Sequence, residues 1–132
     1  MAHLFTFTSQ QFRQADERPN PINPIGGEGV LKWLVGQLNE RGFATDVPDA
    51  EDWGWYTSVS VGGRTYLLGA SGDWSEQYAP TEWTVQLHLN RSLWNKVSGA
   101  NKMESNDDVS IAVEQILRAN PEVIGLELDR GV

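Results

Sequence analysis

The stretch that decides the fold reads WGWYTSVSVGGRTYLLGA and covers residues 53–70. From residue 53 to residue 61, bulky or β-branched side chains alternate with glycine, tyrosine or serine, which is typical of a strand with one buried face. Gly62 and Gly63 then supply two adjacent residues that tolerate positive φ, as a two-residue hairpin turn requires. The stretch therefore predicts two antiparallel strands, 53–61 and 65–70, joined by a tight turn.

Four other segments also predict strands. Residues 4–8 and 83–89 alternate apolar with polar side chains, whereas residues 43–47 and 124–128 are shorter strand candidates. The prolines and asparagines within residues 16–25 can continue neither a helix nor a central strand. We therefore expect an extended connector there, too short to separate two domains.

A first helix is predicted by apolar residues from Val30 to Leu38, which recur at spacings of three and four. The glycine-rich run 26–29 precedes it, and Gly42 supplies a C-terminal stop. A glycine run before a helix also suggests a phosphate-binding loop. No Lys-Ser or Lys-Thr pair follows it and the G-x-G-x-x-G spacing is absent, so a flexible helix entrance is the favoured interpretation.

A second helix is predicted over residues 109–117, where apolar residues again follow helical spacing. Ser105 followed by Asp108 resembles a capping box with Asp in place of Glu, and Asn120-Pro121 ends the helix. Residues 92–102 show no clear period and are expected to form a loop.

The order of these segments predicts an α+β fold. It runs strand, helix, three or four mostly hairpin-linked strands, helix and short strand, and no βαβ unit repeats. We expect a two-layer sandwich in which a mainly antiparallel sheet of about five strands carries two helices on one face. At 132 residues the chain has the length of one domain, spanning 1–132. The other face of the sheet would carry Tyr56, Ser58, Ser60, Gln86 and His88.

Acidic residues outnumber basic ones. The chain has 18 Asp and Glu against 10 Lys and Arg, a formal net charge of −8, and its basic residues are scattered singly. This distribution argues against a nucleic-acid partner, because phosphate binding draws on clustered Lys and Arg. The negative balance serves solubility in one interpretation and attraction to a basic protein surface in the other.

Several classes of site and location are excluded or disfavoured by composition. The chain has no cysteine, which removes disulfides, thiolate zinc sites and cysteine nucleophiles. His3 and His88 are too few for a multi-histidine metal site, and no cofactor motif occurs. The N-terminus has no signal-peptide pattern and no run approaches a membrane span, so a cytoplasmic protein without membrane contact is expected.

One run combines two carboxylates with three aromatic side chains around a glycine, namely EDWGWY at residues 51–56. From Arg41 through this run to the hairpin at residues 62–63, the chain resembles small bacterial proteins of no assigned activity, which carry a similar acidic-Trp-Gly-Trp entrance to a strand. The resemblance implies a bacterial origin and brings no activity, cofactor or catalytic residue with it.

Tryptophan is abundant, with six in the chain, and two interpretations of the aromatic residues stay open. Trp53 and Trp55 lie two residues apart, so both are expected on one face of their strand, packing the helices or binding a ligand. Trp74 lies in the polar, turn-rich segment 71–80. An aromatic side chain there either covers the edge of the core or contacts a partner.

The leading functional hypothesis is a non-catalytic binding protein, of the immunity or inhibitor kind, that engages a protein partner through an acidic and aromatic rim. A basic partner is favoured by the charge of the chain. The predicted binding residues are Glu51, Asp52, Trp53, Trp55, Trp74, Glu76 and Tyr78.

Two alternatives remain. In the first, the protein binds a small ligand or carbohydrate, with Trp rings stacked on it, Asp52 or Glu76 fixing hydroxyls, and hydrolase activity in addition. In the second, a homodimer buries the open sheet face through Tyr56, Ser60 and Gln86. No catalytic residue is assigned, because a pairing of His88 with a nearby serine lacks any supporting nucleophile motif.

Overall fold

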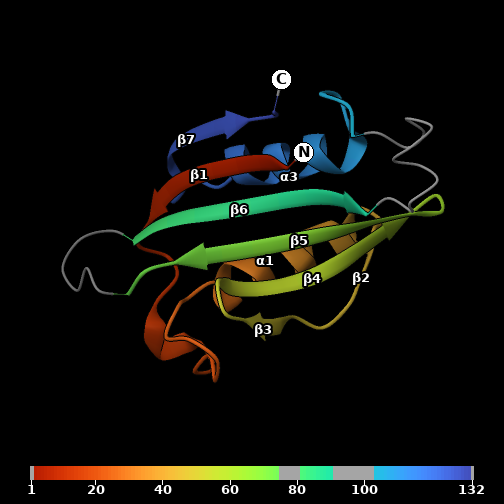
Figure 1. The fold of residues 1–132 in the computed structure, drawn as a ribbon. Coiled ribbons are helices and arrows are strands. Elements are labelled where there is room, and N and C mark those ends of the chain that lie inside the picture. Colours follow the sequence, from red (N-terminus) through yellow and green to blue (C-terminus); the bar gives the residue numbers. More distant parts are fainter. Residues whose placement is uncertain (1, 75–80, 91–102, 132) are drawn as a thin grey trace.

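The hairpin predicted at residues 53–70 is present in an antiparallel sheet (Figure 1). The computed structural model describes residues 2–74, 81–90 and 103–131. Within these residues the elements are, in chain order, β1 (His3–Ser9), η1 (Gln14–Asp16), α1 (Glu28–Glu40), β2 (Ala44–Thr45), β3 (Asp49–Glu51), β4 (Gly54–Val61), β5 (Arg64–Gly72), β6 (Thr81–Asn90), α3 (Asp108–Ala119) and β7 (Ile124–Asp129). The strand order is β2-β4-β5-β6-β1-β7, and β3 also pairs with β4.

The turn of this hairpin, between β4 and β5, has the predicted chemistry. Gly62 and Gly63 adopt φ values of 55° and 77°, and Val61 pairs with Arg64 across the turn. Two successive positive φ values belong to the tight turn whose twist matches that of the flanking strands. The register that follows places Tyr56 opposite Gly69.

The described part of the chain has seven strands rather than about five. The difference lies beside β4, where the short strands β2 and β3 pair with successive parts of the same neighbour. Pro48 lies between them and has no N–H to donate to a ladder, so the edge of the sheet is divided into two short pieces. The predicted strand 43–47 is thereby reduced to Ala44–Thr45.

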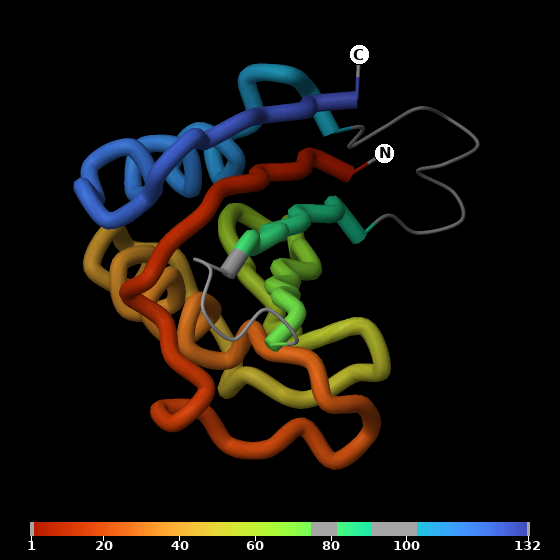
Figure 2. Tube along the Cα trace, turned by 90° about the vertical axis from the view of Figure 1, so that its left-hand side faces the viewer, coloured from red at the N-terminus to blue at the C-terminus, as the bar shows by residue number. Residues whose placement is uncertain are grey.

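Helices α1 and α3 lie on the same side of the sheet, as the end-on view of Figure 2 shows. The side chains between sheet and helices form a core of buried aromatic and aliphatic residues. The largest fully buried apolar side chains are Trp83, Tyr66, Phe5, Phe7, Leu31, Leu34, Leu38, Leu68, Leu87 and Leu117. We call the opposite face of the sheet the open face; its strand residues include Thr6, Tyr56, Ser58, Thr84, Gln86 and His88.

Both ends of α1 have the glycines that the sequence predicted. Gly27 precedes α1 with φ of 145°, and Gly42 follows it with φ of 91°. The N–H of Phe43 donates to the carbonyl of Leu38 at 3.0 Å, which satisfies one of the last helical carbonyls. The second helix ends at Ala119, directly before Asn120, as predicted.

The predicted cap of the second helix is wrong. Asp107, rather than Ser105, is the N-cap residue of α3, and its carboxylate accepts the N–H of Ser110 at 3.0 Å. The other carboxylate oxygen accepts the hydroxyl of Tyr66 at 2.6 Å. Burial, together with this bond, raises the pKa of Tyr66. Asp107 therefore joins the start of α3 to the centre of the sheet, a contact that local spacing does not reveal.

We expect Asp107→Ala to lower the free energy of unfolding by about 2–4 kcal/mol, since it removes a helix cap and leaves the buried Tyr66 hydroxyl without its acceptor. Asp108→Ala is the matched control, because Asp108 is exposed and pairs with Arg64 at 2.8 Å. It should cost at most about 1 kcal/mol. Urea unfolding curves measure both, and equal losses would contradict this role of Asp107.

Candidate functional site

Two carboxylates fasten the segment 10–27 to the start of α1. Glu17 accepts the backbone N–H groups of Gly27 at 3.1 Å and Gly29 at 2.9 Å. Burial raises the pKa of Glu17, and these hydrogen bonds oppose that rise. Glu28 is 1% exposed and binds both the backbone N–H and the guanidinium of Arg18. Sequence reasoning selected neither acid, and both are occupied in holding the chain together.

The same segment also positions the acidic-aromatic run of the sequence. The guanidinium of Arg18 lies over the ring of Trp55, 5.2 Å from its centroid. The amide of Asn20 donates to the carbonyls of Glu51 and Gly54, both at 3.0 Å. Segment 10–27 thus supports the junction between β3 and β4. The hydrogen-bonded partners are 31 and 34 residues apart in sequence.

Trp53 and Trp55 lie on opposite faces of the sheet, so the expectation that they share one face is wrong. Trp55 is buried in the core at 2% exposure. The ring of Trp53 lies on the open face above Gly69, where an added Cβ would come within 2.5 Å of its Cη2 atom. The cause is Gly54, whose φ of 152° changes the direction of the chain between the two residues.

Trp53 lines an open cleft of about 480 Å³ at one end of the open face. Its walls come from the segment 10–27, the ends of β5 and β6, and the junction before β4. The cleft residues are Asn23, Pro24, Ile25, Trp53, Ser71, Gly72, Asp73, Glu82 and Thr84. An indole ring beside two carboxylates and two hydroxyl groups is suited to a cationic side chain or to a polyhydroxylated ligand.

A second, smaller hollow of about 190 Å³ lies beside the cleft on the open face. It is lined by Thr6, Phe7, Thr8, Glu82, Ile124, Gly125 and Glu127. Glu82 borders both spaces, because it pairs with Thr8 across β6 and β1. A carboxylate is therefore shared between two neighbouring hollows on the same surface.

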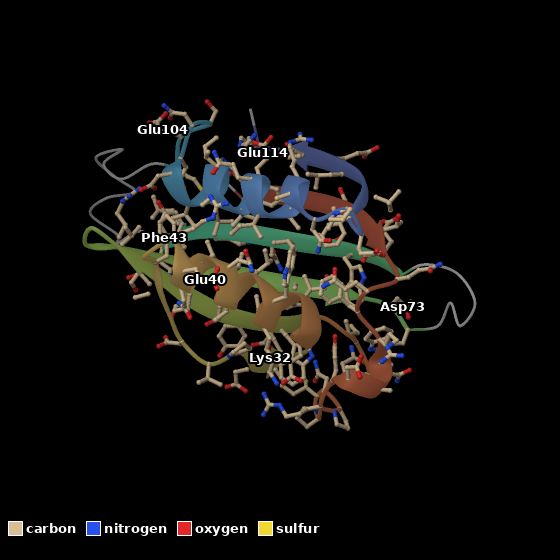
Figure 3. The ribbon with its side chains drawn as sticks, turned by 180° about the vertical axis from the view of Figure 1, so that it is seen from behind. Lys32, Glu40, Phe43, Asp73, Glu104 and Glu114 are labelled. Atoms are coloured by element: carbon tan, nitrogen blue, oxygen red, sulfur yellow. The ribbon has the colours of Figure 1, made fainter. Side chains whose placement is uncertain are left out.

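None of the described Lys and Arg residues occupies a strand position on the open face, and each binds an acidic or amide group on the helix side or in segment 10–27. The pairs are Arg13–Asp16, Arg18–Glu28, Lys32–Glu28, Arg41–Gln115, Arg64–Asp108, Arg118–Glu114 and Arg130–Glu114. Figure 3, which looks onto the helices, shows Lys32 and Glu114 on that side. The strands of the open face instead present Glu82, Glu127 and Asp129.

The other predicted binding residues are spread over different environments. Asp52 is exposed, and its backbone carbonyl accepts the amide of Asn23 at 2.9 Å, which places it near the rim of the cleft. The carboxylate of Glu51, which is half-buried, accepts the backbone N–H of Asp52 at 3.1 Å. Glu76 and Tyr78 lie outside the described residues.

Trp74 serves the edge of the core. Its ring meets that of Trp83 edge to face, with centroids 5.1 Å apart, and covers Gly26. Its outer surface lines a separate pocket of about 140 Å³ that is otherwise formed by residues of segment 10–27. Of the two interpretations of this loop aromatic, the described contacts support packing against the core.

The two histidines do not form a catalytic arrangement. His88 bonds to Gln86 at 2.8 Å, and Leu67 separates it from Ser58 on the open face. His3 lies 2.7 Å from the hydroxyl of Ser110, and both are buried at 1% and 0% exposure. Sequence reasoning missed this pair, although the alternation of His3 with Phe5 places it on the buried face of β1.

Comparisons of the chain with protein-family models, with curated proteins and with solved structures found no match. Within residues 2–74, 81–90 and 103–131, no group of three or more His, Asp or Glu side chains is placed to hold a metal ion. No helix in that part of the chain is long and apolar enough to cross a membrane. The function must therefore be inferred from the geometry and charge of the chain itself.

We expect Gly69→Ala to displace the Trp53 ring, because the new methyl group would occupy the space of the indole. The indole N–H resonance of Trp53, assigned with Trp53→Phe, should shift, and the free energy of unfolding should fall by about 1–3 kcal/mol. Gly36→Ala in α1 is the control, since a Cβ there meets nothing within 4 Å. It should stabilise the protein by about 0.5–1 kcal/mol. An unmoved Trp53 resonance in Gly69→Ala would contradict the placement of the ring.

Acid should destabilise the fold through His3. Burial and then Arg130 lower the pKa of His3 from 6.5, so the unfolded chain binds a proton that folded His3 excludes. This contribution to stability is full above 6.5 and is lost as pH falls through the lower folded pKa. Between about pH 7 and pH 5, the loss of unfolding free energy should be smaller in His3→Asn. A His3 proton resonance that titrates at or above 6.5 in the folded protein would contradict this prediction.

Proposed function

We propose that this chain is a non-catalytic binding protein, of the immunity or inhibitor kind, that engages a basic protein partner through the open face of its sheet. The observation that carries the proposal is the segregation of charge. The described strands of that face present Glu82, Glu127 and Asp129, whereas the described Lys and Arg side chains bind groups elsewhere.

This arrangement favours a macromolecular partner over mere solubility. A surface that only serves solubility can mix both signs of charge, whereas a one-signed face attracts and orients a partner of opposite sign. The face also has apolar and aromatic groups that give a partner area to bury, namely Leu4, Trp53 and Tyr56. We therefore place the proposed binding surface on the open face, with Trp53 of the predicted rim at its end and Asp52 nearby.

A second candidate function is binding of a carbohydrate or small polar ligand in the cleft beside Trp53. The observation that favours it is the position of that indole ring beside Asp73 and Glu82 within a space of about 480 Å³. An aromatic ring next to carboxylates is an arrangement on which a sugar can stack and form hydrogen bonds. A saturable change in Trp fluorescence on titration with neutral sugars would support this candidate.

The leading proposal predicts that capture of a partner depends on the acids of the open face. An open-face variant removes three of these charges: Glu82→Gln, Glu127→Gln and Asp129→Asn. A control variant removes three exposed charges elsewhere: Glu40→Gln, Glu104→Gln and Glu122→Gln. Wild type and control should retain a basic protein from lysate of the source organism, and the open-face variant should retain it at least about ten-fold less.

The measurement is quantitative mass spectrometry of the captured proteins, at about 50 mM and about 300 mM salt, because salt screens attraction between exposed charges. The mass of the free protein in solution is measured alongside, since a homodimer through the open face would compete with a partner. A partner held equally by both variants would place the interface elsewhere. A wild-type protein that retains no basic protein at either salt concentration would contradict the proposal.

A further inference from the structure

The cleft beside Trp53 and the smaller hollow are neighbours on the open face and share Glu82 as a lining residue. The register aligns them: Thr84 lies between Ser71 on β5 and Thr6 on β1, and Thr6 pairs onward with Glu127 on β7. Glu82 stands between the two spaces and lines both. A ligand that extends across the strands here would therefore meet an acid on each side of Glu82.

The spacing of the two hollows matches a simple pattern in an extended chain. Neighbouring strands lie about 4.8 Å apart, so the three spacings from β5 to β7 cover about 14 Å. The midpoints of the two hollows are then roughly 7–10 Å apart along this direction. In an extended peptide, side chains on one side recur every second residue, at a spacing of about 6.7 Å. Because Lys and Arg side chains are long and flexible, their charged groups can lie farther apart than this.

The chemistry of each hollow suits a cation. The first has the face of Trp53 and the carboxylates of Asp73 and Glu82, and the second has Glu82 and Glu127. Neither is lined by a Lys or Arg of the described residues. A guanidinium or ammonium group gains from an indole face as well as from carboxylates. Threonine hydroxyls along both spaces can bond the remaining donors.

We propose that the open face recognises an extended segment of the partner with two cationic residues at positions i and i+2, one side chain in the cleft beside Trp53 and the other in the hollow between Glu82 and Glu127. This inference rests on the proposed function, because it names the part of the partner that the acidic face binds. Glu82 is the central contact, since among the described residues it alone lines both the cleft and the hollow.

The test uses two blocked pentapeptides of glycine and arginine with the same charge. One has arginine at the second and fourth positions, so that both side chains point to one side, and the other has arginine at the second and third. Binding is followed at low salt by the indole N–H resonance of Trp53. We expect the alternating peptide to bind about three- to ten-fold more tightly and to shift that resonance.

Glu82→Gln should abolish the preference between the two peptides, and Glu40→Gln, an equal change of charge on α1, should preserve it. Thermal unfolding followed by circular dichroism verifies that both variants fold. Glu127→Gln provides a second variant, which should weaken only the alternating peptide. Equal binding of the two peptides to the wild type, an unshifted Trp53 resonance, or a preference that survives in Glu82→Gln would overturn the inference.

Failure of this inference and failure of the proposed function give different results. If the peptides show no preference but the open-face variant still loses its partner, the face binds a partner by another pattern of charge. In another outcome, the alternating peptide is preferred through Glu82 while the open-face variant captures the partner as well as the wild type does. In that case the peptide recognition is supported and the proposed interface with the partner is wrong. A neutral disaccharide that shifts Trp53 when neither peptide does would overturn the inference in favour of the carbohydrate candidate.

Discussion

Tryptophan rings packed directly on glycine backbone hold the end of the sheet at which the candidate site lies. A Cβ at Gly72 would lie 2.4 Å from Trp83, and one at Gly26 would lie 2.3 Å from Trp74. The two rings meet edge to face, and the two glycines pair through their backbones. Any side chain at either glycine would push a ring out of a closely packed arrangement. Segment 10–27 therefore keeps its place against β5 and β6 only while both positions are glycine.

Two acids, the half-buried Glu17 and the buried Glu28, complete this arrangement and hold a wall of the cleft. Glu17 accepts backbone N–H groups at the start of α1, where the partial positive charge of the helix favours a carboxylate. Glu28 holds Arg18, which in turn covers Trp55. Because a buried charge without a partner is costly, the fully buried Glu28 depends on its contacts with Arg18. Asn23 lies in the same segment, so one wall of the cleft is anchored by the core.

The sequence predicted what depends on near neighbours. The hairpin at residues 62–63 and both helices follow from local spacing and turn chemistry, and the structure contains them. The opposite placement of the rings on either side of Gly54 escaped prediction, because alternation assumes an unbroken strand and the positive φ of one residue reverses it. The buried contact of His3 with Ser110 joins residues 107 positions apart, and periodicity carries no information about such partners. The neighbours that Trp53 acquires in the cleft, Asp73 and Glu82, likewise depend on strand pairing, which local spacing does not specify.

The acidity of the open face is a consequence of how the helix side is built. Arg64 and Arg130 reach from the sheet toward α3, where they bind Asp108 and Glu114. These cations stabilise the packing of the helices, and the described basic side chains are thereby directed away from the other face. Among the described residues, the charged side chains at open-face strand positions are therefore acids, namely Glu82, Glu127 and Asp129. The ion pairs that bind Arg64 and Arg130 at α3 thus keep these two cations on the helix side, and a cation that reaches Glu82 and Glu127 can come from outside the chain.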